Sequence, residues 1–139
     1  YKSPLSCAAE NGRVDAAKAL LKAGADTEAV GTENRTPIHY AAERGLAEVV
    51  KLLVDAGANK EKVDNDGYTP LMRATYRGKV EVVKVLLAAG VDLKKKNSQG
   101  KTALAISKER IAIQDPYSIA TNQGREQITA LLEQAGAKV

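Results

Sequence analysis

The chain has 139 residues, of which 44% are hydrophobic and 27% charged, a composition typical of one folded unit. Because it has no Trp, no Phe and only five Tyr, we expect its core to be aliphatic. A single Cys excludes an internal disulfide, one Cys with one His excludes an ordinary closed zinc site, and no apolar run approaches the roughly 18–20 residues of a membrane span. Residues 1–66 carry nine Lys/Arg and eleven Asp/Glu, whereas residues 67–139 carry twelve and six. This asymmetry indicates either an acidic partner for the basic half or Lys and Arg side chains that simply solvate helix surfaces.

The first predicted element of each unit is a short helix that starts at a Ser or Thr, usually followed by Pro. The hydroxyl side chain is a preferred N-cap, and Pro at the first helical position loses no hydrogen bond. Nine residues later, Gly12, Gly45 or Gly78 offers the left-handed conformation that ends a helix. The starts recur every 33 residues, at Ser3-Pro4-Leu5, Thr36-Pro37-Ile38, Thr69-Pro70-Leu71 and Thr102-Ala103-Leu104.

A second helix is predicted next in each unit. An acidic residue in its first turn complements the helix dipole, and apolar residues follow at helical spacing, as in Val49, Val50, Leu53 and Val54. Glycines then end this helix, at Gly24, Gly57 and Gly90. A polar connection leads to the next unit and turns at Asp66-Gly67, at Gln99-Gly100 and, earlier, at Asn34. Asn is the residue type other than Gly that best tolerates a positive φ.

Together, Thr36-Pro37-Ile38-His39-Tyr40-Ala41-Ala42, the later Gly45 and Leu53…Gly57-Ala58, and Asp66-Gly67-Tyr68-Thr69-Pro70-Leu71 resemble the ankyrin repeat. The resemblance covers nearly the whole chain. It implies an all-α fold, a single-domain α-solenoid of stacked helix-turn-helix pairs linked by β-hairpin-like fingers. We divide the chain into four units, at about residues 1–30, 31–63, 64–96 and 97–139.

The fourth unit departs from the period. If Gly124 corresponds to Gly12, the step from Thr102 to this Gly is 22 residues where the earlier units take nine, which indicates about thirteen extra residues within about 110–123. Because Pro disfavours helix at the residue before it, we expect a turn at residues 114–118. A lengthened first helix would precede this loop and a second helix of ordinary length would follow it. Such a loop is either a binding element or a tolerated insertion.

No arrangement of a nucleophile with a base, of metal ligands or of phosphate-binding glycines is visible, so we expect no enzyme, cofactor or metal site. The resemblance implies that His39 is a structural residue that hydrogen-bonds a neighbouring finger. The equivalent positions carry Ser6, Met72 and Ala105. We expect Cys7 to be a small packed thiol rather than a nucleophile.

In proteins that this chain resembles, partners bind the fingers and the concave face of the first helices. Equivalent positions on that face form two columns, one with Arg44, Arg77 and Arg110 and one with Lys2, Arg35, Tyr68 and Lys101. The third unit is the densest, and Tyr and Arg are enriched at binding hot spots. We therefore predict that a partner binds Arg35, Arg44, Tyr68, Arg73, Tyr76, Arg77, Lys101 and Arg110.

Two features leave alternatives open. Arg73 stands where ankyrin-like repeats usually carry an aliphatic residue, and it either stacks on Tyr40 of the preceding unit or contacts a ligand. Lys94-Lys95-Lys96 either forms a positive rim with Lys101, Arg73 and Arg77 that attracts an acidic peptide, or is an ordinary solvated finger.

The leading hypothesis is a monomeric, non-catalytic protein–protein interaction module that holds a partner peptide or protein surface, with acidic groups, on its concave face. Binding of nucleic acid or anionic lipid through the basic C-terminal half is an alternative, against which Glu43, Glu81 and Glu109 stand. A further alternative is a capping or spacer fragment of a longer array. Sparse Cys usage and the lack of an export signal favour the cytoplasm or the nucleus.

Overall fold

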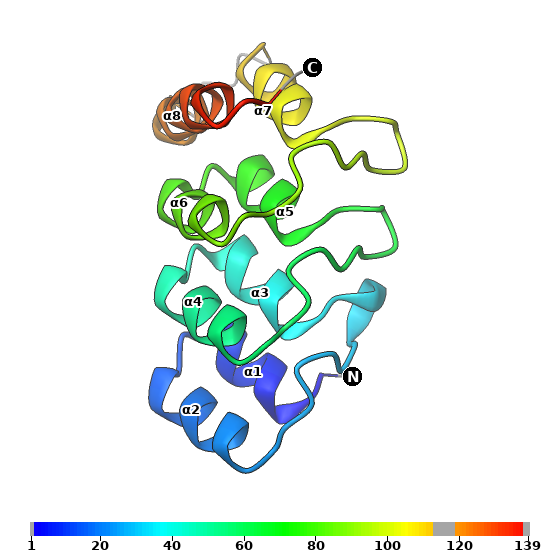
Figure 1. Cartoon of the computed structure of the whole chain (residues 1–139), viewed down its shortest axis with the longest axis vertical. Helices are drawn as coiled ribbons and strands as arrows, with labels where there is room; N and C mark the ends of the chain where they lie inside the picture. Colours follow the sequence, from blue (N-terminus) through cyan, green and yellow to red (C-terminus); the bar gives the residue numbers. More distant parts are fainter. Residues whose placement is uncertain (1, 113–118, 138–139) are drawn as a thin grey trace.

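In the computed structural model, which describes residues 2–112 and 119–137, the chain forms eight α-helices and one short 3-10 helix. The helices are α1 (Pro4–Glu10), α2 (Val14–Lys22), η1 (Thr32–Asn34), α3 (Pro37–Arg44), α4 (Ala47–Asp55), α5 (Pro70–Arg77), α6 (Val80–Ala88), α7 (Ala103–Ala112) and α8 (Ile119–Gln134). They stack as two columns, the inner α1, α3, α5 and α7 and the outer α2, α4, α6 and α8 (Figure 1). The predicted all-α solenoid of helix pairs is confirmed.

The predicted caps begin the inner helices. The Ser3 hydroxyl accepts a hydrogen bond from the N–H of Ser6, and the Thr69 hydroxyl accepts one from the N–H of Met72. The Thr102 hydroxyl accepts one from the N–H of Ala105, at 3.2 Å. Each bond satisfies one of the N–H groups that the first helical turn leaves unpaired, which is worth about 1 kcal/mol per cap. The same local chemistry therefore starts every pair at the same point of the 33-residue period.

Glycines end the inner helices, as predicted. Gly45 after α3 and Gly78 after α5 have φ of 76° and 72°, in the left-handed region that side chains disfavour. Asn34 also has a positive φ, of 60°, in agreement with its predicted place in a turn.

The core lies between the two columns and is aliphatic. The outer helices turn Val49, Val50 and Leu53, and then Val82, Val83 and Leu86, inward, all 1% exposed or less. A fully buried side chain of this size stabilises the fold by roughly 1.5–3 kcal/mol relative to an exposed one. Each pair shares this core with its neighbouring pairs, so the described helices pack around one continuous hydrophobic core.

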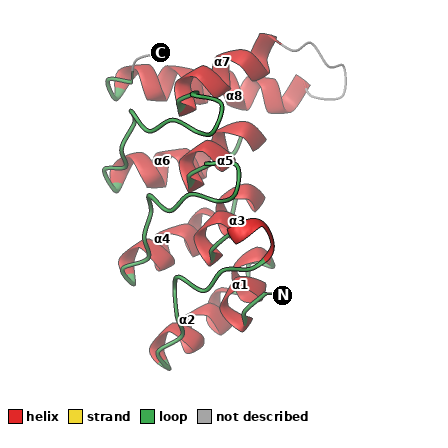
Figure 2. Cartoon of the chain, turned by 90° about the vertical axis from the view of Figure 1, so that its right-hand side faces the viewer, coloured by secondary structure: helices red, strands yellow, loops and turns green. Residues whose placement is uncertain are grey.

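The connections between pairs project as fingers from the side of the inner column (Figures 1 and 2). No β-strand occurs among the described residues, but each finger closes on a backbone hydrogen bond across five residues. These bonds join Gly31 N–H to Arg35 O, Asp64 N–H to Tyr68 O and Asn97 N–H to Lys101 O, at 2.9, 3.1 and 2.9 Å. Successive fingers are also bonded to one another, from Asn65 N–H to Glu33 O and from Ser98 N–H to Asp66 O.

The contact between the last two fingers explains one glycine. A Cβ at Gly67 would lie 2.7 Å from the backbone nitrogen of Ser98, and φ there is 73°. Any side chain at this position would push the two fingers apart. Gly67 therefore fixes the spacing of the fingers as well as the turn.

The fourth helix pair differs from the expectation. The first helix, α7, has 10 residues against 8 in α3 and α5, so it is lengthened as predicted. The prediction of an ordinary second helix is wrong, because α8 has 16 residues against 9 in α6. Residues added before Gly124 extend α8 at its N-terminal end. The predicted turn at 114–118 lies outside the described residues.

The role of Gly124 also differs from that of Gly12. Gly124 lies inside α8 rather than at the end of an inner helix. A Cβ there would lie 2.7 Å from the carbonyl oxygen of Gly78. Gly124 therefore allows α8 to approach the backbone at the turn between α5 and α6.

The prediction of a packed Cys7 is wrong as well, because this thiol is exposed. The equivalent Tyr40 and Arg73 are 5% and 8% exposed, since a finger covers each of them. No finger of the described chain stands in front of Cys7.

Candidate functional site

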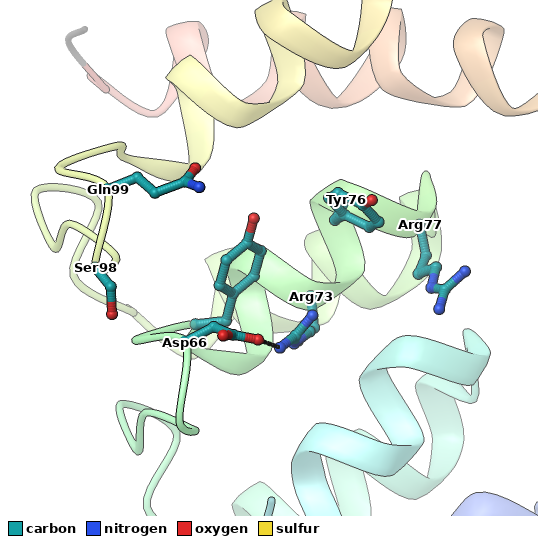
Figure 3. A pocket seen from close by; sticks show the side chains of 7 residues that line it. Asp66, Arg73, Tyr76, Arg77, Ser98 and Gln99 are labelled. Atoms are coloured by element: carbon teal, nitrogen blue, oxygen red, sulfur yellow. Dashed lines mark hydrogen bonds and ion pairs between the residues drawn. The ribbon is translucent and has the colours of Figure 1, made fainter. Parts of the chain in front are cut away.

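The surface between the fingers and the inner helices, which we call the finger face, carries three open pockets. The first, of about 420 Å³, is lined by Tyr68, Arg73, Tyr76 and Arg77 together with Asp66, Ser98 and Gln99 (Figure 3). A second of about 260 Å³ adjoins it, since Tyr68, Tyr76 and Gln99 line both, and it adds Lys101, Ile106, Glu109 and Arg110. A third of about 610 Å³ is lined by Glu10, Arg35, Tyr40, Glu43, Arg44, Arg77 and Lys79. All eight predicted binding residues therefore line these pockets.

Equivalent residues on the finger face form sets of three, which we call triplets. Each triplet has the residue two positions before the start of an inner helix, the inner-helix residue eight positions later, and an arginine of the next inner helix 34 positions after that. Triplet 1 is Lys2, Glu10 and Arg44; triplet 2 is Arg35, Glu43 and Arg77; triplet 3 is Tyr68, Tyr76 and Arg110.

A glutamate joins two cations in triplets 1 and 2. Glu10 pairs with Lys2 and, at 3.2 Å, with Arg44. Glu43 accepts from Arg35 Nη1 at 2.9 Å and from Arg77 Nη2 and Nε at 2.8 and 3.1 Å. The hydrogen bond from Lys2 lowers the pKa of Glu10, so its carboxylate stays ionised. Both triplets link one unit to the next through a carboxylate that two cations share.

Triplet 3 has no carboxylate, because tyrosines take both the finger and the helix positions. The rings of Tyr68 and Tyr76 meet edge to face, with centroids 6.1 Å apart and planes at 78°. The Arg110 guanidinium lies over the Tyr76 ring, 4.4 Å from its centroid. Triplet 3 therefore has an aromatic pair with a cation over one ring where the other triplets have ion pairs. Both the edge-to-face ring contact and the cation–π contact are attractive.

Arg73 packs against Tyr68 of triplet 3 and is itself held by two carboxylates. Its Nε donates to Asp64 Oδ2 at 2.7 Å and its Nη2 lies 2.6 Å from the same oxygen, while Asp66 pairs with it at 3.1 Å (Figure 3). Burial lowers the pKa of Arg73, but the hydrogen bonds and charge of Asp64 outweigh burial and the net shift is upward. Arg73 is therefore a fixed cation.

The predicted stacking of Arg73 on Tyr40 is wrong. The guanidinium lies over the ring of Tyr68, 4.2 Å from its centroid, because Asp64 and Asp66 draw it toward the finger of its own unit. Lys2 takes the place over the Tyr40 ring, at 4.8 Å. Burial also raises the pKa of the Tyr68 phenol, which therefore stays protonated as a hydrogen-bond donor.

His39 ties triplet 3 to the preceding unit. Its Nδ1 accepts from the backbone N–H of Thr36 at 3.2 Å, so its Nε2 carries the proton that Tyr68 O accepts at 2.9 Å. This confirms the predicted bond to a neighbouring finger. Burial lowers the pKa of His39, so the neutral ring is the native form.

The lysine rim is not part of these pockets. Lys94, Lys95 and Lys96 line none of the three, and the Lys95 ammonium donates to the carbonyl oxygen of Glu61 at 2.9 Å. Of the proposed rim only Lys101, Arg73 and Arg77 lie on the finger face. Lys101 is paired there with Glu109.

Sequence reasoning missed Asp64 and Arg125, which position the site. Asp64 is 4% exposed and accepts from the N–H groups of Asp66 and Tyr68 besides its bonds to Arg73. The turn signal was present, since the equivalent Asn97 makes the same two bonds to Gln99 and Lys101. Arg125, 4% exposed, donates to the carbonyl oxygen of Tyr76 at 2.6 and 3.1 Å. No pattern in the sequence signals that long-range bond.

Within residues 2–112 and 119–137, no group of three His, Cys, Asp or Glu is placed to hold a metal ion. Over the same residues, every helix is too short or too polar to cross a membrane.

A model of the family described as ankyrin repeats (3 copies) matches this sequence twice, over residues 5–97 and residues 59–139. A comparison with curated proteins finds no match.

Proposed function

Because the chain belongs to the ankyrin repeat family, whose repeats generally mediate protein–protein interactions, we propose that its finger face holds a peptide or a surface loop of a partner protein. The family is typically non-enzymatic, and a non-catalytic role is part of the proposal. So are a monomeric state and a place in the cytoplasm or the nucleus.

The convergence of Tyr68, Arg73, Tyr76 and Arg77 on one pocket supports this proposal most directly. Tyrosine and arginine dominate binding hot spots because they bury a large area and keep a hydrogen-bonding end. Three of these side chains are held in place before any partner arrives, by the ring contact of Tyr68 with Tyr76 and by the bonds of Arg73 to Asp64. Such preorganisation lowers the entropy cost of binding.

Charge pairing on the finger face favours a peptide over nucleic acid. Arg44 and Arg77 are bound to Glu10 and Glu43, and Lys101 is bound to Glu109, so most cations here already have a carboxylate partner. A polyanion needs a row of unpaired cations along its backbone. Local, isolated positive charge suits a single acidic group better.

The test is a selection of random 12-residue peptides on the intact chain. Peptides that bind the finger face should lose at least tenfold in affinity to the double variant Tyr76→Ala/Arg77→Ala, as hot-spot truncations do. A matched control is Lys51→Ala/Lys84→Ala, which alters a pocket of about 400 Å³ between α4 and α6 on the outer side. This control should leave affinity unchanged.

Two results would overturn the proposal. One is that no peptide is enriched. The other is that selected peptides bind the Tyr76/Arg77 variant as well as the unmodified chain but lose affinity to the Lys51/Lys84 variant, which would assign binding to the outer helices. Thermal unfolding of each variant checks that the stack remains folded.

A further inference from the structure

Triplet 3 differs from triplets 1 and 2 by one missing group. In those triplets a carboxylate stands between the finger and the arginine of the next helix, as Glu10 does for Arg44 and Glu43 for Arg77. In triplet 3 the equivalent residue is Tyr76, and among the described residues no carboxylate lies within ion-pair distance of Arg110. The arginine that the repeat pattern pairs with an acid has the face of an aromatic ring instead.

Arg110 also has an unused hydrogen-bond donor. Its Nε is buried and has no hydrogen-bond partner among the described residues. Of the triplet 2 arginines, Arg77 donates its Nε–H to Glu43 at 3.1 Å, whereas Arg35 Nε is also without a hydrogen-bond partner among these residues. Arg35 nevertheless has Glu43 as an ion-pair partner, and Arg110 has no such partner in the described part of the chain. A buried donor without a partner costs about 1–3 kcal/mol, so a ligand that accepts from Arg110 gains that bond.

A second cation without a carboxylate stands beside Tyr76. Arg125 donates to the Tyr76 carbonyl and to Asn122 Oδ1, at 2.9 Å, and no acid of the described chain pairs with it. Burial first, and then the positive charge of Arg110, lowers the pKa of Arg125. The acids near this corner are already engaged, Glu109 with Lys101 and Glu43 with Arg35 and Arg77. The corner around Tyr76 therefore has positive charge in excess.

The space for an acid is present. The pocket of about 260 Å³ brings Arg110, Lys101 and the two tyrosines to one opening. It adjoins the pocket of about 420 Å³, since Tyr68, Tyr76 and Gln99 line both. A side chain that enters the smaller pocket leaves its own backbone and neighbours over the larger one, which suits an extended peptide better than a free anion.

From these observations we infer that triplet 3 is a binding site for a carboxylate of a partner peptide, an Asp or Glu side chain that takes the place Glu10 and Glu43 hold in the other triplets and accepts from Arg110. The inference rests on the proposed function and names the chemistry that the finger face selects. The planar guanidinium matches the carboxylate in shape and charge, and such charge-assisted bonds are about twice as strong as neutral ones.

The first test uses a single amino acid as the probe. N-acetylglutamate N′-methylamide is titrated into the 15N-labelled chain, and the Nε–H resonances of the arginines are followed by NMR. The Arg110 resonance should shift and saturate, whereas that of Arg77, already bound to Glu43, should not move. The uncharged N-acetylglutamine N′-methylamide should shift neither. Equal, unsaturated shifts of all arginines would overturn the inference, since they report charge screening alone.

The second test supplies the acid from within. Tyr76→Glu recreates the ion-pair triplet and should weaken the binding of peptides selected on the unmodified chain at least tenfold more than Tyr76→Gln does. Gln has the size of Glu without its charge, so the two variants differ only in whether Arg110 is already paired. Lys84→Ala removes a positive charge from the outer helix α6, away from the finger face, and should leave the affinity within twofold.

The outcomes separate the inference from the proposed function. Selected peptides that depend on Tyr76 and Arg77 but are not enriched in Asp or Glu would keep the finger face as the binding surface and overturn the carboxylate site. So would equal effects of Tyr76→Glu and Tyr76→Gln. An absence of any enriched peptide, with the single-residue probe still saturating at Arg110, would keep the carboxylate site and overturn the proposed function.

Discussion

Triplets 2 and 3 occupy equivalent places on successive helix pairs, but they use opposite chemistry. In triplet 2, Glu43 forms ion pairs with both Arg35 and Arg77 and so binds two units together. In triplet 3 two tyrosines stand at the first two positions, and Arg110 rests on a ring. The backbone frame is the same in both, since each begins at a capped helix and a finger closed by one hydrogen bond.

If triplet 3 binds a carboxylate as proposed, the comparison explains how a repeat turns a structural position into a binding one. A repeat supplies the same contact to each unit, and a unit that lacks one partner presents the remaining groups to solvent in a fixed geometry. Two further contacts hold triplet 3, the Asp64–Arg73 pair beside Tyr68 and the bonds from Arg125 to the Tyr76 carbonyl oxygen. Asp64 also lies 3.7 Å from Arg35 Nε of triplet 2. The variants below alter the residues that hold triplet 3 in place and then triplet 3 itself.

The largest effect is expected at Asp64. Asp64→Asn keeps the turn, because the amide oxygen can accept from Asp66 and Tyr68 N–H as Asn97 does, but it leaves the Arg73 charge without its buried partner. Breaking a buried pair costs about 3–5 kcal/mol. Urea unfolding measures the loss. Asp66→Asn is the control, and its exposed pair with Arg73 should contribute less than about 1 kcal/mol. Equal effects of the two variants would contradict this role of Asp64.

At Gly124, the test is whether replacement by Ala raises or lowers the stability of the fold. Ala in place of Gly inside a helix normally stabilises a protein by about 0.5–1 kcal/mol. Gly124→Ala should instead destabilise by roughly 1–3 kcal/mol, since its Cβ meets the Gly78 carbonyl at 2.7 Å and pushes α8 away from α5 and α6. Thermal unfolding decides between the signs. A higher melting temperature would show that α8 is not seated closely enough for Arg125 to hold Tyr76.

Stability should fall below about pH 6.5 because of His39. Burial lowers the pKa of His39 in the folded chain below the ordinary value of about 6.5 for a His side chain, so the unfolded chain takes up a proton first as the pH falls. The stabilising contribution is complete above pH 6.5 and is lost below it, by at most about 1.4 kcal/mol per pH unit.

The sequence makes this measurement simple, since His39 is the only His. Urea unfolding of the unmodified chain at pH 7.5 and pH 5.5 should show the decrease, and His39→Gln should remove most of it. A pH dependence that persists in this variant would mean that His39 does not tie Tyr68 in its neutral form.

The smallest effect on stability is expected when triplet 3 is converted into triplet 2. The double variant Tyr68→Arg/Tyr76→Glu exchanges an aromatic pair for a partly exposed ion pair, and each is worth about 1 kcal/mol or less. The free energy of unfolding should therefore change by less than about 1 kcal/mol. A loss of several kcal/mol would show that the tyrosines belong to the core rather than to a binding surface.

The period of 33 residues was enough to predict the helix pairs, their caps and the finger face. Caps such as Thr69 and turns such as Gly78 act within a few residues, so the sequence carries them directly. Contacts between residues far apart in the sequence could not be predicted from such local patterns. The stacking partner of Arg73 depends on Asp64 and Asp66, and the place of Arg125 depends on the extended α8, which the inserted residues displace from the period.

The account depends most on the assignment of an external carboxylate to Arg110. A double-mutant cycle measures it directly, with Arg110→Gln in the chain and Glu→Gln or Asp→Asn at the acid of the tightest selected peptide. A coupling free energy of about 1.5 kcal/mol or more is expected, and the same cycle with Arg44→Gln should give a value near zero. A coupling near zero at Arg110, or an equal one at Arg44, would contradict the account.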